Sequence, residues 1–216
     1  DYESTIEVDR NDIEDDQIGV YTPMIQGLAQ AAKEHPDYLV FSLLAAGFTT
    51  TCFDGQYFFD TDHPVGASTQ SNYGGGASNA WYLMDLSRPI KPIILQIRKQ
   101  PQFVSMDKPD DENAFMRKKY RYGVDDRKNV GYGLWQLAFG SKQTLNSTYY
   151  LAGRTAMMGF TKEDNTTPLN IRPTHLVVGP SNEAAGKALV EAQFDATGAS
   201  NIWYNSAKLV VVPWLT

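Results

Sequence analysis

The feature of this sequence that most constrains its fold is a stripe of apolar residues between positions 12 and 35. Its members recur at alternating steps of three and four, the spacing of one face of an amphipathic helix: Ile18, Tyr21, Ile25, Leu28 and Ala32. Thr22-Pro23 lies inside the stripe and indicates either a kink or a short helix followed by a longer one. His35-Pro36 is expected to end this helix and open a second one that stops at Gly47.

Strand patterns elsewhere favour an α+β protein with mixed sheets. Residues 1–10 alternate with the period of a strand, and residues 80–86 and 91–99 are expected to form two paired strands. Residues 65–80, which precede these two strands, are rich in Gly, Ser and Asn, and this composition predicts a mobile surface loop. Further elements are expected as strands around a turn at 125–129, a helix over 146–160, a strand at 174–178, a helix over 182–194 and a closing strand at 207–215.

Composition narrows the class of protein. Hydrophobic residues make up 42 % of the 216 residues and charged residues 20 %, as in globular proteins, and the longest apolar runs fall short of the roughly 20 residues of a membrane-spanning helix. The net charge of -6 disfavours a dedicated DNA reader. The single cysteine, Cys52, excludes an intrachain disulfide.

The densest group of potential ligands and nucleophiles lies in "CFDGQYFFDTDHP", residues 52–64. Carboxylates and imidazole bind divalent metals, and a thiol beside a base and an acid can act as a nucleophile. One alternative is therefore a metal-dependent or cysteine hydrolase built on Asp60, Asp62, His63 and Cys52, with Asp54 as a further candidate acid.

The spacing of these residues matches no HExxH, CxxC or calcium-loop pattern. The sequence instead favours a turn in which Asp60 and Asp62 accept backbone hydrogen bonds and Pro64 fixes the exit, with Cys52 buried as a small apolar side chain. We therefore predict no catalytic residue, no metal ligand and no cofactor.

A second motif, "RKKYRY" at residues 117–122, mixes cations with aromatic residues as a nucleic-acid platform does. Its alternation also fits a strand whose wet face carries Arg117, Lys119 and Arg121. We favour the strand.

Five long segments resemble the major head subunit of Mu-like phages and prophages: "EVDRNDIEDDQIGVYTPM", "CFDGQYFFDTDHPV", "WYLMDLSRPIKPIILQIRK", "YGVDDRKNVGYGLWQLAFGSKQ" and "LNIRPTHLVVGPSNEAAGKALV". They occur in the order of that family, and matches run from about Thr5 to Leu215, nearly the whole chain. Strings of this length are far more specific than any short motif, and the chain is identified as a member of this family.

The resemblance implies the Hong Kong 97-type phage capsid fold, with a peripheral domain containing a long spine helix, an axial domain, and an extended loop that reaches a neighbouring subunit. Residues 1–11 are then expected to be the returning strand of that loop, and residues 12–216 the peripheral and axial lobes, with the boundary between the lobes left open. Family members are longer at the front, so the chain is expected to be a fragment or a trimmed product.

The resemblance also implies a major capsid (head) protein that is not an enzyme. Such a protein self-assembles through hexamers and pentamers into an icosahedral shell, encloses double-stranded DNA without sequence specificity, is assembled in the bacterial host cytoplasm and ends in the virion. Scaffold, protease, portal and decoration proteins are further expected partners, and a membrane is not. A nanocompartment shell of the same fold, which encloses protein cargo, is a second alternative. Contacts between subunits are expected at Glu3, Ile6, Glu7, Val8 and Arg10.

Overall fold

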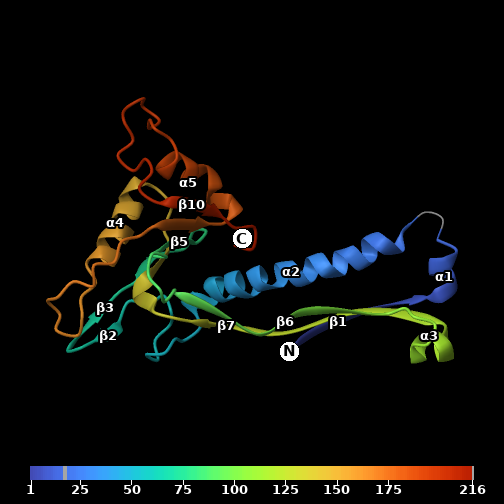
Figure 1. The fold of residues 1–216 in the computed structure, drawn as a ribbon. Helices are drawn as coiled ribbons and strands as arrows, with labels where there is room; N and C mark the ends of the chain where they lie inside the picture. The colour runs from blue at the N-terminus through green and yellow to red at the C-terminus, as the bar shows by residue number, and fades with distance from the viewer. Residues whose placement is uncertain (17–18, 216) are drawn as a thin grey trace. The chain divides into compact units, whose positions relative to one another are not determined.

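The computed structural model describes residues 1–16 and 19–215, which form two compact units (Figure 1). Unit 1 comprises Asp1–Leu39 and Leu95–Val130, and unit 2 comprises Val40–Ile94 and the chain from Gly131 onward. Each unit is therefore built from two separate stretches of sequence. Ile18 of the predicted apolar stripe lies outside the described residues.

Unit 1 contains a three-stranded sheet in the order β1-β7-β6 among the described residues. β1 (Tyr2–Asp9) pairs antiparallel with β7 (Lys119–Tyr132), from Tyr2 opposite Asp126 to Asp9 opposite Lys119. β6 (Ile93–Met106) lies on the other side of β7. The strand predicted at residues 1–10 is confirmed. The turn predicted at 125–129 is wrong, because β7 passes through it without interruption.

The helices of this part of the chain are α1 (Arg10–Glu14), α2 (Tyr21–Ala45) and α3 (Glu112–Arg117). Of the two alternatives predicted at Thr22-Pro23, a kink or a short helix followed by a longer one, the structure has the second. The end predicted at His35 is wrong, because α2 continues through Pro36. Proline removes one backbone hydrogen bond from a helix, but burial of Leu28 and Leu44 on either side of Pro36 holds α2 together. A 3₁₀ helix, η1 (Ala46–Phe48), follows at the predicted stop.

Unit 2 is organised around a mixed five-stranded sheet in the order β10-β9-β5-β8-β4. The strands are β4 (Tyr73–Gly76), β5 (Trp81–Met84), β8 (Ala138–Lys142), β9 (His175–Val178) and β10 (Lys208–Val211). β5 pairs antiparallel with β8 and β9, whereas the outer pairs β4-β8 and β9-β10 are parallel. The mixed sheet and the strand predicted at 174–178 are confirmed, whereas the strand predicted at 207–215 is shorter and ends at Val211.

Two predictions for this region are wrong. Residues 80–86 and 91–99 do not pair with each other, because β5 is central in this sheet while β6 pairs with β7. Residues 65–80 are not a mobile loop. They include the end of β2 (His63–Val65), β3 (Ser68–Gln70), which pairs with β2, and β4. Backbone pairing and the burial of Asn72 order this polar stretch.

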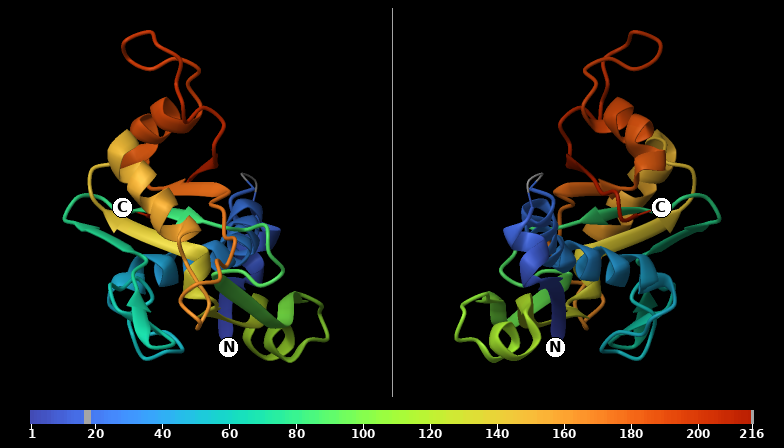
Figure 2. Two further views of the ribbon diagram at one scale, coloured as in Figure 1. Left: turned by 90° about the vertical axis from the view of Figure 1, so that its left-hand side faces the viewer. Right: turned by 90° about the vertical axis from the view of Figure 1, so that its right-hand side faces the viewer.

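Helices α4 (Ser147–Met158) and α5 (Glu183–Val190) pack on the sheet of unit 2 (Figure 1). Asn146 caps α4 by accepting a hydrogen bond from the backbone N–H of Tyr149. The helix predicted over 146–160 is confirmed, and its buried residues are Tyr150, Gly153 and Met157. α5 is shorter than predicted and follows the 3₁₀ helix η3 (Pro180–Asn182), and the segment between α5 and β10 extends as a loop beyond α5 (Figure 2).

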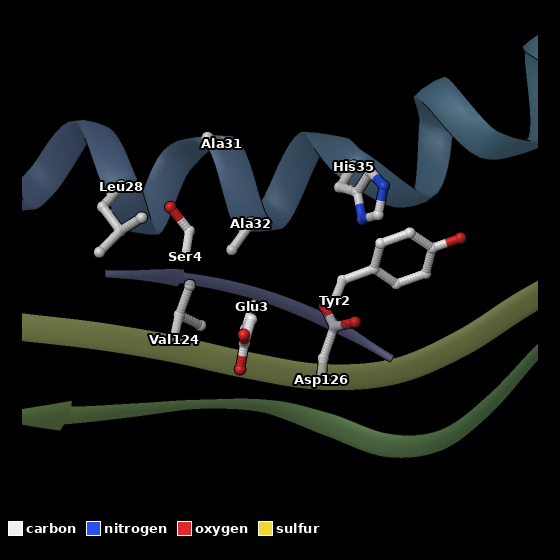
Figure 3. A pocket seen from close by; sticks show the side chains of 9 residues that line it. All are labelled: Tyr2, Glu3, Ser4, Leu28, Ala31, Ala32, His35, Val124 and Asp126. Carbon is white, nitrogen blue, oxygen red and sulfur yellow. The ribbon is translucent and has the colours of Figure 1, made fainter. Parts of the chain in front are cut away.

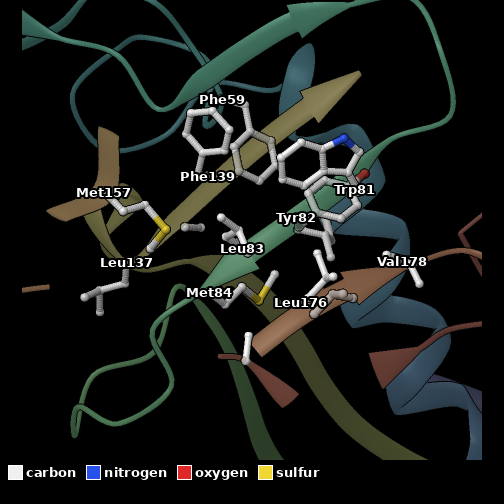
Figure 4. Packing of buried hydrophobic residues seen from close by; sticks show 14 of the residues in the cluster. Phe59, Trp81, Tyr82, Leu83, Met84, Leu137, Phe139, Met157, Leu176 and Val178 are labelled. Carbon is white, nitrogen blue, oxygen red and sulfur yellow. The ribbon is translucent and has the colours of Figure 1, made fainter. Parts of the chain in front are cut away.

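The core of unit 2 lies around β5, whose four residues are all buried. Figure 4 shows their side chains packed between those of β8 and β9. The 3₁₀ helix η2 (Trp135–Leu137), which precedes β8, adds buried Trp135 and Leu137. No helix in the described part of the chain combines the length and the apolar composition that a bilayer crossing requires.

Candidate functional site

The candidate site starts from a tight turn after Cys52. The backbone N–H of Cys52 donates to the carbonyl of Gln56 at 2.8 Å, and Gly55 adopts a positive φ of 89° that glycine tolerates without strain. This turn places the Asp54 carboxylate so that its Oδ1 accepts from the Cys52 thiol at 3.0 Å and from the Gln56 N–H at 3.1 Å. Asp54 is thereby fixed toward the interior of unit 2.

His63 lies fully buried at the start of β2 between two oxygen atoms. Its Nδ1 is 2.7 Å from Asp54 Oδ2, and its Nε2 is 3.1 Å from Asn72 Oδ1. The imidazole ring stacks on the indole of Trp135 with centroids 4.0 Å apart and planes at 11°. Its orientation is therefore fixed by contacts on the ring edge and on the ring face.

Asn72 completes the cluster and was missed by sequence reasoning. Its amide nitrogen donates to the carbonyl of Phe58 at 2.8 Å and lies near those of Trp135 and Ala138, and its Oδ1 also accepts from the Asp60 N–H at 2.9 Å. It sits in a Gly- and Ser-rich stretch, where asparagine normally indicates a turn. The sequence carries no signal that would single it out.

The donor atoms of Cys52, Asp54 and His63 all lie within 4.8 Å of one another, so the chemistry of a metal or nucleophile site must be weighed. Burial and the Asp54 carboxylate raise the pKa of the Cys52 thiol to about 11. A thiolate, which nucleophilic attack requires, is therefore scarce near neutral pH. Burial acts to raise the pKa of Asp54, but hydrogen bonds from Cys52, His63 and the Gln56 N–H outweigh it and lower that pKa.

The two other acids of the hydrolase alternative lie outside this group. Asp60 accepts hydrogen bonds from the N–H groups of Tyr57 at 3.1 Å and Thr61 at 2.7 Å, which is the turn role predicted for it. Asp62 is exposed and accepts no backbone hydrogen bond from any described residue, so its predicted turn role is wrong. The four hydrolase residues are therefore not assembled into one site, and Cys52, Asp54, His63 and Asn72 instead form a compact polar cluster.

The residues predicted to contact a neighbouring subunit lie on or next to β1. The Glu7 carboxylate accepts from Lys119 Nζ and Arg121 Nε, each at 2.6 Å, and these two cations lower its pKa. Of the three cations predicted on the solvent-exposed face of the "RKKYRY" strand, Lys119 and Arg121 thus pair with Glu7, whereas Arg117 belongs to α3. Val8 is buried, Ile6 is half-buried, Arg10 lies 3.6 Å from Glu14, and Glu3 is exposed.

Comparison with known proteins identifies the family. The family described as Mu-like prophage major head subunit gpT matches residues 1–215. The Mu-like prophage FluMu major head subunit of Haemophilus influenzae is 46 % identical over 203 residues, covering 88 % of this chain and 66 % of that protein. The major capsid protein of Escherichia phage Mu is 35 % identical over 230 residues, covering 99 % of this chain and 74 % of that protein.

The solved structures that match this chain are also phage capsid proteins. A chain of the procapsid of bacteriophage JBD30 matches with a TM-score of 0.83 and 44 % identity over 99 % of this chain and 75 % of that one. The JBD30 capsid decorated with minor capsid protein trimers matches with a TM-score of 0.85 and 31 % identity over 100 % of this chain and 74 % of that one. The chain thus spans about two thirds to three quarters of the length of these relatives. It belongs to the Mu-like prophage major head subunit family, a family of structural capsid proteins and not of enzymes.

Proposed function

We propose that the protein containing this chain is the major subunit of a phage head and that its activity is self-assembly into the shell. The observation that carries this proposal is the match of nearly every residue to JBD30 capsid chains, at TM-scores of 0.83 to 0.85. The identities of 31 to 46 % to named head proteins support it. These relatives are phage and prophage proteins, which favours a DNA-containing head over the nanocompartment alternative.

Within this function, the parts of the chain take the roles of a Hong Kong 97-type capsid subunit. α2, with 25 residues the longest helix among those described, is the spine helix. Unit 1 corresponds to the peripheral domain and unit 2 to the axial domain, and residues 1–11 form the returning strand of the extended loop.

The loop strand supplies a contact between subunits through Glu3, Ile6, Glu7, Val8 and Arg10. Exposed Glu3 and half-buried Ile6 offer the accessible part of this contact. Glu7 and Val8 support it from within the subunit, because Glu7 pairs with Lys119 and Arg121 of β7 and the side chain of Val8 is buried.

The partners of the assembled shell are further copies of the subunit in hexamers and pentamers, packaged double-stranded DNA, and accessory proteins of scaffold, protease, portal and decoration type. Decoration is supported by the JBD30 capsid, which carries minor capsid protein trimers.

The experiment that tests this function is the native mass of the full-length protein and of this chain, by size exclusion with light scattering. Particles of megadalton mass, or discrete pentamers and hexamers, from the full-length protein are the expected result, with nucleic acid rather than protein as the content of particles isolated from infected cells. A full-length protein that remains monomeric under all assembly conditions would contradict the proposal.

A further inference from the structure

Asn72 determines which nitrogen of His63 carries a hydrogen. Its Oδ1 accepts from the Asp60 N–H at 2.9 Å, and its Nδ2 donates to the carbonyl of Phe58 at 2.8 Å. The orientation of the side-chain amide is therefore fixed at both ends. Because an amide oxygen only accepts hydrogen bonds, His63 Nε2, which lies 3.1 Å away, is a donor and carries a hydrogen.

The second ring nitrogen of His63 faces a carboxylate oxygen. Nδ1 lies 2.7 Å from Oδ2 of Asp54, which is the length of a charge-assisted hydrogen bond. A neutral imidazole with its hydrogen on Nε2 would direct the lone pair of Nδ1 at this oxygen, and two lone pairs at such a distance repel each other. A proton must therefore lie between Nδ1 of His63 and Oδ2 of Asp54.

The surroundings place this proton on His63 and leave Asp54 ionised. Burial opposes the charge of Asp54, but hydrogen bonds from Cys52, His63 and the Gln56 N–H outweigh burial and lower its pKa. The imidazole ring stacks on the indole of Trp135 with centroids 4.0 Å apart, and the face of an indole attracts a cation. With a hydrogen on each nitrogen, His63 donates to both of the oxygens that it faces.

The titratable groups around the pair do not oppose a cation. Burial and Asp54 raise the pKa of Cys52 to about 11, and burial raises the pKa of Tyr132, which lies near Cys52, to about 12, so both stay neutral near neutral pH. The charged groups are Asp60, which lies beyond Asn72, and three residues that line a cavity of about 610 Å³ together with Asp54: Lys162, Glu163 and Asp164. One positive and three negative charges thus surround the pair. No lysine or arginine in the described part of the chain forms an ion pair with Asp54, whose cationic partner is His63.

The contacts of Asp54, His63 and Asn72 connect separate segments of unit 2. Asp54 belongs to the turn at 52–56, His63 begins β2, and the amide of Asn72 lies near the carbonyl of Ala138 in β8. Removal of the Nδ1 proton would turn the contact at the centre of this chain of side chains from attraction into repulsion. The mutual position of these segments therefore depends on one proton.

We propose that His63 is an imidazolium ion whose buried ion pair with Asp54 acts as a proton-dependent clamp on unit 2. The clamp is closed while both ring nitrogens of His63 carry a proton, and it weakens as the pH rises and the Nδ1 proton is lost. An ordinary histidine in an unfolded chain releases its second proton at about pH 6.5. Above that pH the folded state therefore holds one proton more than the unfolded state, and stability falls as the pH rises. The clamp belongs to unit 2 alone and does not depend on assembly into a shell.

Nuclear magnetic resonance of the histidine side chains reads the clamp directly, because the chain has three histidines. At about pH 7.5 an ordinary histidine is about tenfold more neutral than charged. We expect long-range ¹H–¹⁵N spectra of the labelled chain at this pH, with EDTA present to remove metal ions, to show one imidazolium, at His63, and two neutral rings. His35 and His175 are internal controls, because burial and nearby lysines lower the pKa of each. Figure 3 shows His35 beside the Tyr2 ring, away from any such pair.

The variant Asp54→Asn separates the clamp from the burial of His63. An asparagine amide can donate to Nδ1 while its oxygen still accepts from the Gln56 N–H, so His63 no longer needs a second proton. We expect the imidazolium signal to disappear in Asp54→Asn and to persist in Asp62→Asn, the matched control at an exposed acid next to His63 in the sequence. The wild-type spectrum decides the charge of His63 by itself, whether or not Asp54→Asn folds.

Urea titrations of the chain between about pH 6.5 and 8, below the range in which an ordinary thiol titrates, measure the effect of the clamp on stability. We expect the folding equilibrium constant of the wild type to fall by up to about tenfold per pH unit, the limit for one proton, and that of Asp54→Asn to fall less steeply. A neutral His63 in the wild-type spectrum, or the same pH dependence in the wild type and in Asp54→Asn, would overturn the clamp and leave the shell function intact.

Discussion

At the scale of single residues, Asn72 joins separate segments of unit 2. Its amide nitrogen donates to the carbonyl of Phe58 and lies near the carbonyls of Trp135 and Ala138. Its amide oxygen accepts from the Asp60 N–H and lies 3.1 Å from His63 Nε2. A buried polar group that loses its partner costs about 1–3 kcal/mol. We expect Asn72→Ala to lower the free energy of unfolding by about 3 kcal/mol in urea titrations, and Asn79→Ala, at an exposed position, to leave it within about 0.5 kcal/mol of wild type.

Cys52 provides a second prediction at this scale. Because its pKa lies near 11 instead of 9.0, the thiolate fraction near neutral pH is about a hundredfold below that of an ordinary cysteine. We expect Cys52 to react with an aromatic disulfide reagent far more slowly in the native protein than in urea-unfolded protein. Equal rates in the two states would contradict the buried, hydrogen-bonded thiol.

The lowered pKa of Asp54 determines the direction in which folding stability changes with pH. Its pKa is lower in the folded chain than the ordinary 3.8, so its contribution to stability is present above that value and is lost as the pH falls through the folded pKa. We expect wild-type stability to decrease more steeply than that of Asp54→Asn when urea titrations are repeated below about pH 4. Asp62→Asn, which changes an exposed acid outside this cluster, serves as the control.

At the scale of elements, two glycines show how packing decides the effect of one substitution. A Cβ added at Gly153 of α4 would lie 2.8 Å from the ring of Phe139, whereas one added at Gly27 of α2 would meet no atom within 4 Å. Alanine favours a helix over glycine by about 1 kcal/mol. We expect Gly27→Ala to raise the melting temperature and Gly153→Ala to lower stability by about 1–3 kcal/mol through overpacking. A stabilised Gly153→Ala would show that the α4–β8 contact is looser than described.

The elements that the sequence predicts correctly are those whose pattern is local. The N-terminal strand, α4, the strand at 174–178 and the first part of the strand predicted at 207–215 follow from periodicity and capping alone. The errors arise where distant residues decide. Burial of Leu28 and Leu44 carries α2 through Pro36, and β5 and β6, adjacent in sequence, belong to different sheets.

The same limit applies to the candidate site. Cys52, Asp54 and His63 are close in sequence and therefore stand out as a group, and the lack of any catalytic spacing favours a structural role for them. Asn72 became part of the site only through β8 and Phe58, which no local pattern connects to it.

At the scale of the whole molecule, the net charge of -6 bears on how a shell treats the nucleic acid it encloses. Non-specific DNA affinity arises from cations that displace counterions from phosphates. We expect no saturable binding of a fluorescent DNA duplex to this chain in anisotropy titrations at an ionic strength of about 0.15 M. Tight binding that weakens steeply with added salt would instead reveal a basic surface that the overall charge conceals.

The pairing of β1 with β7 has a consequence for the order of events on the ribosome. Asp9 pairs with Lys119, 110 residues later, so β1 emerges long before its partner exists. At translation rates of about 5–20 residues per second, the wait is roughly 6 to 22 s. An unpaired strand edge is prone to aggregation during such an interval, and charges along the strand protect it. We therefore expect Glu3, Glu7 and Asp9, which lie along β1, to oppose such aggregation before Glu7 pairs with Lys119 and Arg121.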